Sequence, residues 1–382
     1  MTKLKVAWLS DMDVIGSGYL NLSIPLCEGL AQRGHEVKVA ALGYNGTEHN
    51  YNFSLIPAKS MQEALAVAQN LFNLWKFDAF VVALDIPIQE QILHSMMQKP
   101  PFKYVGIMPV EADPLCLSWA MALMQMDKVF VISQFGTDEA KKVGIDAEHI
   151  QLGIDTNAWR MPEVKERKKI RDVMGFEEDT FAVLTVADNQ ERKNLSHAMD
   201  VFAKFAENKS NAKYIFVTRE NNSVGWRLRD YARELGISEK VIIFERGMPF
   251  SELWAIYAAC DMFFLSSKAE GLSLPLLEAM ACGLPIMATD CTAVHELLDN
   301  GRGTLVKYDY VHRDPFGNGR RYWIDRRDAL EKMEGIYTKT SALNIDKAVK
   351  KARKYVETRT WDIAVEQLES GLLKLVEERS GN

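Results

Sequence analysis

One stretch in the second half of the chain combines two carboxylates with a short glycine-bearing turn. Glu270 precedes the turn Gly271-Leu272-Ser273, and Glu278 follows on an apolar run typical of a helix. A turn of this kind after a buried strand lets backbone N–H groups approach a phosphate, and the helix N-terminus adds positive charge. Carboxylates are strong acceptors that suit vicinal diols. We therefore expect Gly271, Leu272 and Ser273 to cradle a diphosphate, Glu270 to face a sugar and Glu278 to accept from ribose hydroxyls.

With Pro275 and the sequence Ala-Cys-Gly-Leu-Pro at 281–285, this stretch resembles the Glu-x7-Glu motif of the retaining glycosyltransferases of family 4, also called group 1. The resemblance implies a GT-B fold, an α/β architecture in which two Rossmann-like doubly wound domains face each other across a cleft. It also implies transfer of a hexose-type sugar from a nucleotide-diphosphate sugar, such as a UDP- or GDP-sugar, to a hydroxyl acceptor. Neither a metal nor a further cofactor is expected. Two glutamates at this spacing also occur by chance on surface helices.

A basic segment follows another predicted strand and resembles the family's basic loop. It contains Arg192 and Lys193, whose fixed charge would stabilise the diphosphate as its bond to the sugar breaks. Both could instead be solvated charges at a helix start. Relatives usually carry an arginine near Asp188, where an acid would repel a diphosphate. Three alternatives follow: Asp188 points away and Arg192 substitutes, the donor binds differently, or the chain is a weak or non-catalytic relative that still binds nucleotide sugar.

Two loops resemble further parts of the family's donor site. Arg246 and Met248 lie in the segment 245–249 between a predicted strand and helix, where they would flank the nucleotide base. Gly16 and Gly18 follow the first predicted strand, where the family's glycine-bearing loop approaches the donor phosphates. Ordinary tight turns would explain both loops equally well.

Acidic residues in the first half are candidates for contacts to the acceptor. Glu111 follows the predicted strand 104–108, where many relatives place a histidine, so we expect it to orient the acceptor hydroxyl or to stabilise the developing oxocarbenium ion. Asp113 is the second choice, and both could be plain loop carboxylates. Asp11 and Asp13 form a DxD sequence of the type that holds manganese in other glycosyltransferases, but in this fold it is expected to be a chance occurrence.

Short apolar runs alternate with helical patterns along most of the chain, which predicts parallel sheets covered on both faces. Periodicity is lost at 153–162, so we predict an N-terminal acceptor-side domain at 1–156 and a donor-binding domain at 157–358. Residues 359–382 are predicted to form a helix that crosses back to the first domain. The aromatic and basic segment 308–325 is predicted to be an ordered insertion or loop. A chain of 382 residues suits two domains.

The amino-acid composition limits the classes of binding partner and the cellular location to be expected. The net charge of −6 gives no general attraction for nucleic acid. Five dispersed cysteines suit reduced core thiols, and the apolar run near the N-terminus is too short for a signal peptide or a transmembrane segment. We expect a cytoplasmic protein, or one peripheral to a membrane, that acts on a carbohydrate, lipid or protein hydroxyl. A sugar-nucleotide epimerase is a further alternative.

Overall fold

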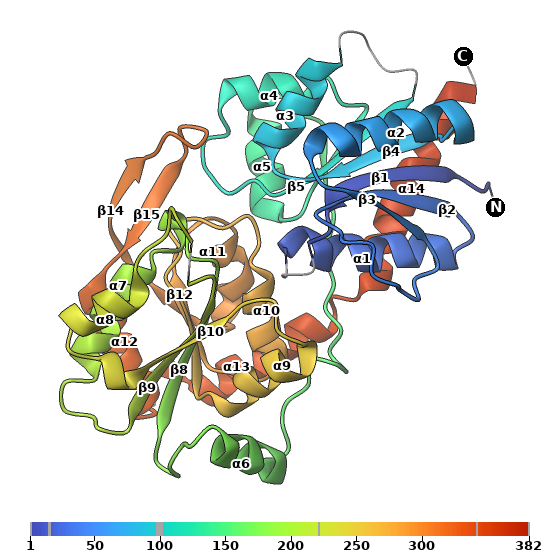
Figure 1. Ribbon diagram of the computed structural model, residues 1–382. Coiled ribbons are helices and arrows are strands. Elements are labelled where there is room, and N and C mark those ends of the chain that lie inside the picture. The colour runs from blue at the N-terminus through green and yellow to red at the C-terminus, as the bar shows by residue number, and fades with distance from the viewer. Residues whose placement is uncertain (1, 14–16, 97–101, 221, 341–342, 381–382) are drawn as a thin grey trace. The chain divides into compact units, whose positions relative to one another are not determined.

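The computed structural model describes residues 2–13, 17–96, 102–220, 222–340 and 343–380, and the chain divides into two compact units (Figure 1). Unit 1 contains Met1–Gly153, Phe316–Gly319 and Arg359–Asn382, and unit 2 contains Ile154–Pro315 and Arg320–Thr358. Each unit is built on its own parallel sheet. No helix in the described ranges combines the length and the apolar character needed to cross a bilayer.

Unit 1 is a doubly wound sheet of seven strands in the order β3-β2-β1-β4-β5-β6-β7. The strands are β1 (Lys5–Asp11), β2 (Glu36–Leu42), β3 (Ser54–Ala58), β4 (Ala79–Ala83), β5 (Lys103–Met108), β6 (Lys128–Val131) and β7 (Ala147–His149). The connecting helices are α1 (Gly18–Gln32), α2 (Met61–Trp75), α3 (Ile86–Ser95), α4 (Leu117–Leu123) and α5 (Gln134–Lys142).

Both faces of this sheet are covered, which explains why its central strands, such as β4, are apolar. Every residue of β4 is buried. Side chains alternate along β1: Trp8 donates to Ser23 of α1 at 3.1 Å, whereas Ala7 and Leu9 join the core that contains Ala64 of α2. Figure 1 shows α1 and α2 on opposite faces.

The end of the chain also belongs to unit 1. Helix α14 (Trp361–Ser380) packs along α1, and its Glu369 accepts from Arg33 at 2.9 Å and contacts His35 at 2.8 Å. Gly153 and Trp361 meet in close backbone contact. Residues 359–380 therefore complete the same core as the first third of the chain.

Unit 2 is built on six parallel strands in the order β10-β9-β8-β11-β12-β13. They are β8 (Phe181–Val186), β9 (Ala212–Thr218), β10 (Val241–Glu245), β11 (Met262–Leu265), β12 (Ile286–Thr289) and β13 (Thr304–Val306). The helices are α6 (Val164–Val173), α7 (Leu195–Phe205), α8 (Leu228–Glu234), α9 (Phe250–Ala259), α10 (Leu274–Ala281), α11 (Thr292–Leu298), α12 (Arg326–Tyr337) and α13 (Ile345–Glu357), with short 3-10 turns η1 (Glu191–Lys193), η2 (Ser238–Lys240) and η3 (Asp299–Gly301). Helix α7 packs against α12 and α10 against α13.

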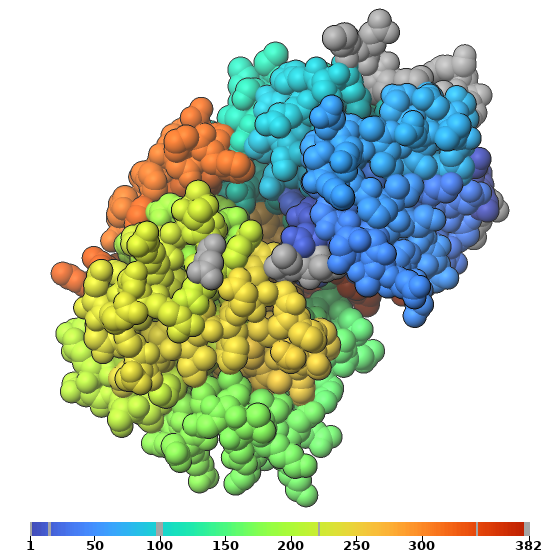
Figure 2. Space-filling model, in the orientation of Figure 1, coloured from blue at the N-terminus to red at the C-terminus, as the bar shows by residue number. Residues whose placement is uncertain are grey.

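Two segments of unit 2 form regular elements whose type was not predicted from the sequence. The charged run that begins at Glu163 forms α6, whose Arg171 is buried and donates to Thr180 O at 2.6 Å. The aromatic segment forms an antiparallel hairpin of β14 (Tyr308–Arg313) and β15 (Arg320–Ile324). This hairpin, orange in Figure 2, forms part of the surface shown there.

The close contact between Gly153 and the start of α14 gives a test of the unit 1 core. A Cβ atom at position 153 would lie against the backbone of Thr360 and Trp361, 2.7 Å from the Trp361 Cα. Because backbone atoms cannot rotate away, Gly153→Ala should lower the free energy of unfolding by about 1–3 kcal/mol in a urea titration. Gly18→Ala is the control, since no atom within 4 Å would meet its Cβ. Equal stability of the two variants would contradict the packing described.

Candidate active site

The site of unit 2 lies where its strand order reverses. Strands β8 and β11 are parallel neighbours, with Met262 opposite Val183 and Phe263 opposite Leu184. The loop after β8 runs from 187 to 194, and the loop after β11 runs from 266 to 273. In open parallel sheets such a switch point opens a crevice between two loops that leave in opposite directions, where ligands bind. The two predicted motifs therefore meet at one edge of the sheet.

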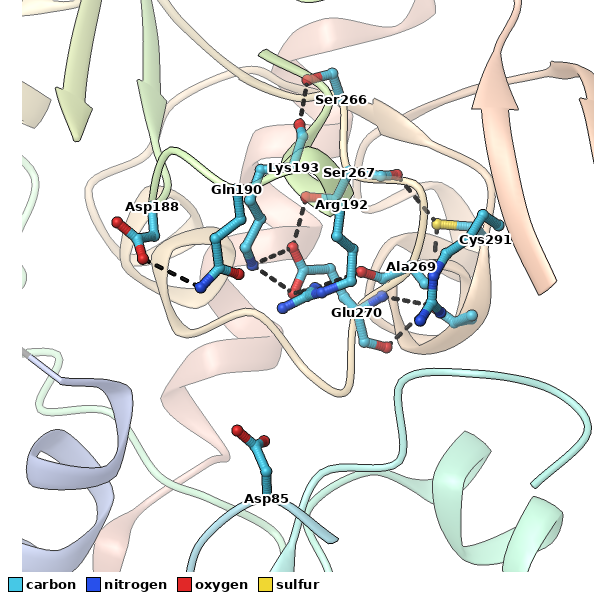
Figure 3. Close-up of polar contacts among 12 residues, drawn as sticks. Asp85, Asp188, Gln190, Arg192, Lys193, Ser266, Ser267, Ala269, Glu270 and Cys291 are labelled. Carbon is cyan, nitrogen blue, oxygen red and sulfur yellow. Dashed lines mark hydrogen bonds and ion pairs between the residues drawn. The ribbon is translucent and has the colours of Figure 1, made fainter. Parts of the chain in front are cut away.

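Glu270 is the centre of a buried charge cluster (Figure 3). Its carboxylate accepts from Lys193 Nζ at 2.7 and 3.0 Å and from Arg192 Nη1 at 3.1 Å. Ser267 donates a further bond of 2.5 Å. Only 4% of Glu270 is exposed. Two cations and an acid that the sequence places almost eighty residues apart thus form one polar group.

The protonation state of Glu270 follows from these contacts. Burial alone would raise the pKa of this carboxyl, but the charges of Lys193 and Arg192, with hydrogen bonds from Lys193 and Ser267, lower it to about 2. Glu270 is therefore ionised at neutral pH. It acts as a fixed acceptor that holds the two cations in place, and it is unsuited to donate a proton in a reaction.

Backbone and hydroxyl contacts fix the two loops against each other. Ser266 Oγ donates to Lys193 O at 2.9 Å, and the Lys268 amide donates to Arg192 O at 2.8 Å. Arg192 also donates to Ala269 O at 2.6 Å. On the far side of the loop, the Glu270 amide donates to Thr292 Oγ1 at 2.8 Å. The charged side chains therefore project from a preorganised frame.

The predicted phosphate turn leads directly into α10. Gly271 and Leu272 are buried, and Ser273 takes a left-handed conformation with φ of 82° just before the helix begins. Within the described chain, the Ser273 side chain makes no capping hydrogen bond to this helix. Pro275 has no N–H and the Leu276 amide donates to Ser273 O at 3.2 Å, so an anion at this point would meet the positive end of the helix dipole. Backbone strain of this kind is found most often at binding sites.

Glu278 lies one turn into α10 and is also buried. Tyr257 of α9 donates to its carboxylate at 2.7 Å. Burial raises the pKa of Glu278 to about 7, although the bond from Tyr257 acts in the opposite direction. The two glutamates of the motif therefore differ. Glu270 is ionised at neutral pH, whereas the pKa of Glu278 lies near neutral pH.

Asp188 occupies the position where an acid was expected to repel a diphosphate. Its carboxylate accepts from Arg219 Nη2 at 2.8 Å and Nε at 3.2 Å, and from Gln190 Nε2 at 3.1 Å. Arg246 lies 3.5 Å away. Figure 3 places Asp188 on the side of Gln190 away from Glu270. Two arginines that follow β9 and β10 therefore balance the negative charge of Asp188. The sequence alone did not indicate these partners.

The remaining sequence candidates are spread over several loops. In unit 2, Met248 is half-buried between β10 and α9. In unit 1, Glu111 and Asp113 follow β5 and are partly buried, and Gly18 is the exposed first residue of α1. Gly16 lies outside the described residues.

The DxD sequence of Asp11 and Asp13, which was expected to be a chance occurrence, forms a local turn. In this turn the Asp13 amide donates to Asp11 Oδ1 at 3.1 Å.

Sequence reasoning missed several residues that shape this site. Ser267 and Lys268 lie just before Glu270 in the sequence, so their proximity to the site could have been predicted. Thr292, Tyr257 and Arg219 belong to other elements, and their roles depend on contacts across the sheet edge. Position at the carboxyl end of a neighbouring strand was the one signal available for Arg219.

Two doubly wound units, with a phosphate-type turn at the switch point of the second, define the GT-B class of fold, and solved structures agree. Sucrose-phosphate synthase of Thermosynechococcus elongatus superposes with a TM-score of 0.77 at 15% identity, covering 98% of this chain and all of that one. Anabaena HepE, solved with UDP-glucose, gives 0.72 at 17% identity, with 99% and 100% covered.

Sequence comparison gives the family. Residues 166–332 match the family described as Glycosyl transferases group 1. Mannosylfructose-phosphate synthase of Agrobacterium fabrum is 27% identical over 213 residues, 52% of this chain and 46% of that protein. EpsD of Bacillus subtilis, a putative glycosyltransferase, is 27% identical over 157 residues, 41% and 40% of the two chains. The matches span less than half the length of these relatives. The segment 166–332 of unit 2 therefore belongs to the group 1 glycosyltransferase family, also called family 4.

The raised pKa of Glu278 makes a prediction for stability. A carboxyl whose pKa rises from 4.5 to about 7 on folding stabilises the fold most below pH 4.5, and this contribution is lost as the pH rises through 7. Glu278→Gln removes that loss. Its free energy of unfolding relative to the parent should therefore rise between about pH 5 and pH 8, by on the order of 2–3 kcal/mol. Urea titrations at both pH values measure it. A difference independent of pH would show that Glu278 titrates normally.

Proposed function

We propose that this protein transfers a hexose-type sugar from a nucleotide-diphosphate sugar to a hydroxyl acceptor with retention of configuration and without a metal. One observation carries the proposal: ionised Glu270 holds Lys193 and Arg192 beside the N-terminus of α10, at the switch point of unit 2. Positive charge held in a dry, rigid frame is what a departing diphosphate requires. The family and the UDP-glucose complex of HepE support the same reaction class.

Each residue of the cluster has a task in this reaction. The turn Gly271–Ser273 and the positive end of the α10 dipole bind the diphosphate, and Glu278 accepts from the ribose. When the bond between the anomeric carbon and the phosphate oxygen breaks, its electron pair passes to the diphosphate. Lys193 and Arg192 stabilise that charge. The acceptor oxygen forms the new bond on the same face of the sugar, and its proton passes to the leaving phosphate oxygen.

Unit 1 supplies the acceptor side in this proposal. Glu111, after β5, orients the acceptor hydroxyl or stabilises the positive charge that develops on the sugar, and Asp113 is the alternative. Gly18, at the start of α1, lies in the loop assigned to the donor phosphates. Arg246 and Met248 flank the nucleotide base. The acceptor class is a carbohydrate, a lipid or a protein hydroxyl.

Turnover tests the role of the charge cluster. The chain is incubated with UDP- and GDP-hexoses and a panel of hydroxyl acceptors, and released nucleotide is measured. Lys193→Met should lower kcat by about 100-fold or more, because a fixed charge on the leaving group is lost. Lys204→Met is the matched control, since that exposed lysine of α7 pairs with exposed Glu207. Full activity of Lys193→Met would remove Lys193 from the mechanism, and interconversion of donors without acceptor would indicate an epimerase.

Nucleotide binding tests Glu278 separately. Glu278→Ala should weaken UDP or GDP binding by about 1–3 kcal/mol, the usual size of hydrogen bonds to a charged group. Isothermal titration calorimetry measures this loss, and Glu207→Ala serves as an exposed acidic control in the same unit. Unchanged affinity in Glu278→Ala would place the ribose elsewhere.

A further inference from the structure

Three neighbouring strands of unit 2 end in charged residues that form one cluster. Asp188 follows β8, Arg219 follows β9 and Arg246 follows β10. These strands are adjacent and parallel, so their carboxyl ends share one edge of the sheet. The same edge carries Glu270 after β11. The cluster therefore adjoins the proposed donor site and belongs to the same unit.

The geometry of the Asp188 carboxylate differs from that of an ordinary surface ion pair. Its side chain is 11% exposed, and its two oxygens accept from two nitrogens of Arg219 and one of Gln190, with Arg246 close by. Exposed pairs contribute little to stability and need no such frame. A bidentate Arg–Asp contact fixes the plane and direction of the guanidinium. Asp188 is thus built to hold Arg219 in one orientation.

Arg219 keeps donors for a ligand while it is held. A guanidinium has five N–H donors, of which the Nε donor and one Nη2 donor contact Asp188. The side chain is 47% exposed. Two guanidinium groups, those of Arg219 and Arg246, face the single carboxylate of Asp188. Nearby Glu220 pairs with Arg229, and the Glu245 carboxylate accepts from the Glu220 amide at 3.2 Å.

We propose that Arg219, oriented by Asp188 and supported by Arg246, binds the diphosphate of the nucleotide-sugar donor. The cation that the family resemblance implies near the end of β8 is here supplied from the ends of β9 and β10. Arg219 is a binding residue and Asp188 is a positioning residue. This inference rests on the proposed function for its ligand class, a nucleoside diphosphate, but it concerns binding rather than turnover.

The role of Arg219 is tested by measuring the binding of UDP and GDP by calorimetry. The kinetics of donor use are measured in parallel. Arg219→Met should raise the Kd of the diphosphate that binds by about tenfold or more, because it removes a charge-assisted contact and leaves Asp188 facing the phosphates. The KM for the donor should rise similarly, while kcat changes much less. Arg229→Met is the matched control: Arg229 is a comparably exposed arginine that pairs with Glu220. Melting temperatures of all variants report folding.

Moving the positive charge from position 219 to position 188 distinguishes a binding role of Arg219 from a purely structural one. In the Arg219→Met background, Asp188→Arg should restore the Kd to within about threefold of the parent, because the cation then projects from β8. A parent-like Kd in Arg219→Met, or a loss that Asp188→Arg does not repair in a folded protein, would overturn the inference. If the parent binds nucleoside diphosphate but turns over no donor, the proposed reaction fails while the Kd comparison still decides the role of Arg219.

Discussion

Glu270 carries a full negative charge inside unit 2, and the arrangement of both site loops follows from how that charge is accommodated. A buried carboxylate is costly unless cations and hydrogen bonds surround it closely. Lys193, Arg192 and Ser267 provide those contacts. The loop after β8 must therefore stay against the loop after β11, and the bonds that the Ser266 hydroxyl and the Lys268 amide donate to its carbonyl groups hold it there.

The two glutamates of the motif show how environment assigns different properties to the same side chain. Both are buried, yet cations lower the pKa of Glu270, whereas Glu278 accepts from the neutral Tyr257 hydroxyl and burial raises its pKa. One carboxylate is permanently ionised, and the other exchanges its proton near neutral pH. In the proposed reaction the first organises charge at the leaving group, and the second adapts to the ribose hydroxyls.

Features that are local in sequence could be predicted, and features that depend on contacts across strands could not. The alternation of apolar runs and helices gave the two parallel sheets, and the GT-B fold and the family were both predicted from the Glu270 motif. The partner of Asp188 was missed because Arg219 lies on the next strand, 31 positions away. The segment 308–325 was predicted to be an ordered insertion or loop, and its antiparallel hairpin depends on pairing between β14 and β15 that the sequence did not indicate. The buried position of Arg171 was not predicted, because its carbonyl partners, Ala259 and Thr180, lie on other segments of the chain.

Lys268 extends the site towards the hairpin. Its ammonium lies over the Trp323 ring, 3.4 Å from the centroid, and pairs with Glu191 in the basic loop. Burial lowers the pKa of Lys268, although Glu191 acts in the opposite direction. Because one side chain contacts both loops and the hairpin, these segments cannot diversify independently. Replacing the aromatic ring of Trp323 would change the surroundings of Lys268. In related sequences, substitutions in the hairpin should therefore occur together with substitutions in the donor loops.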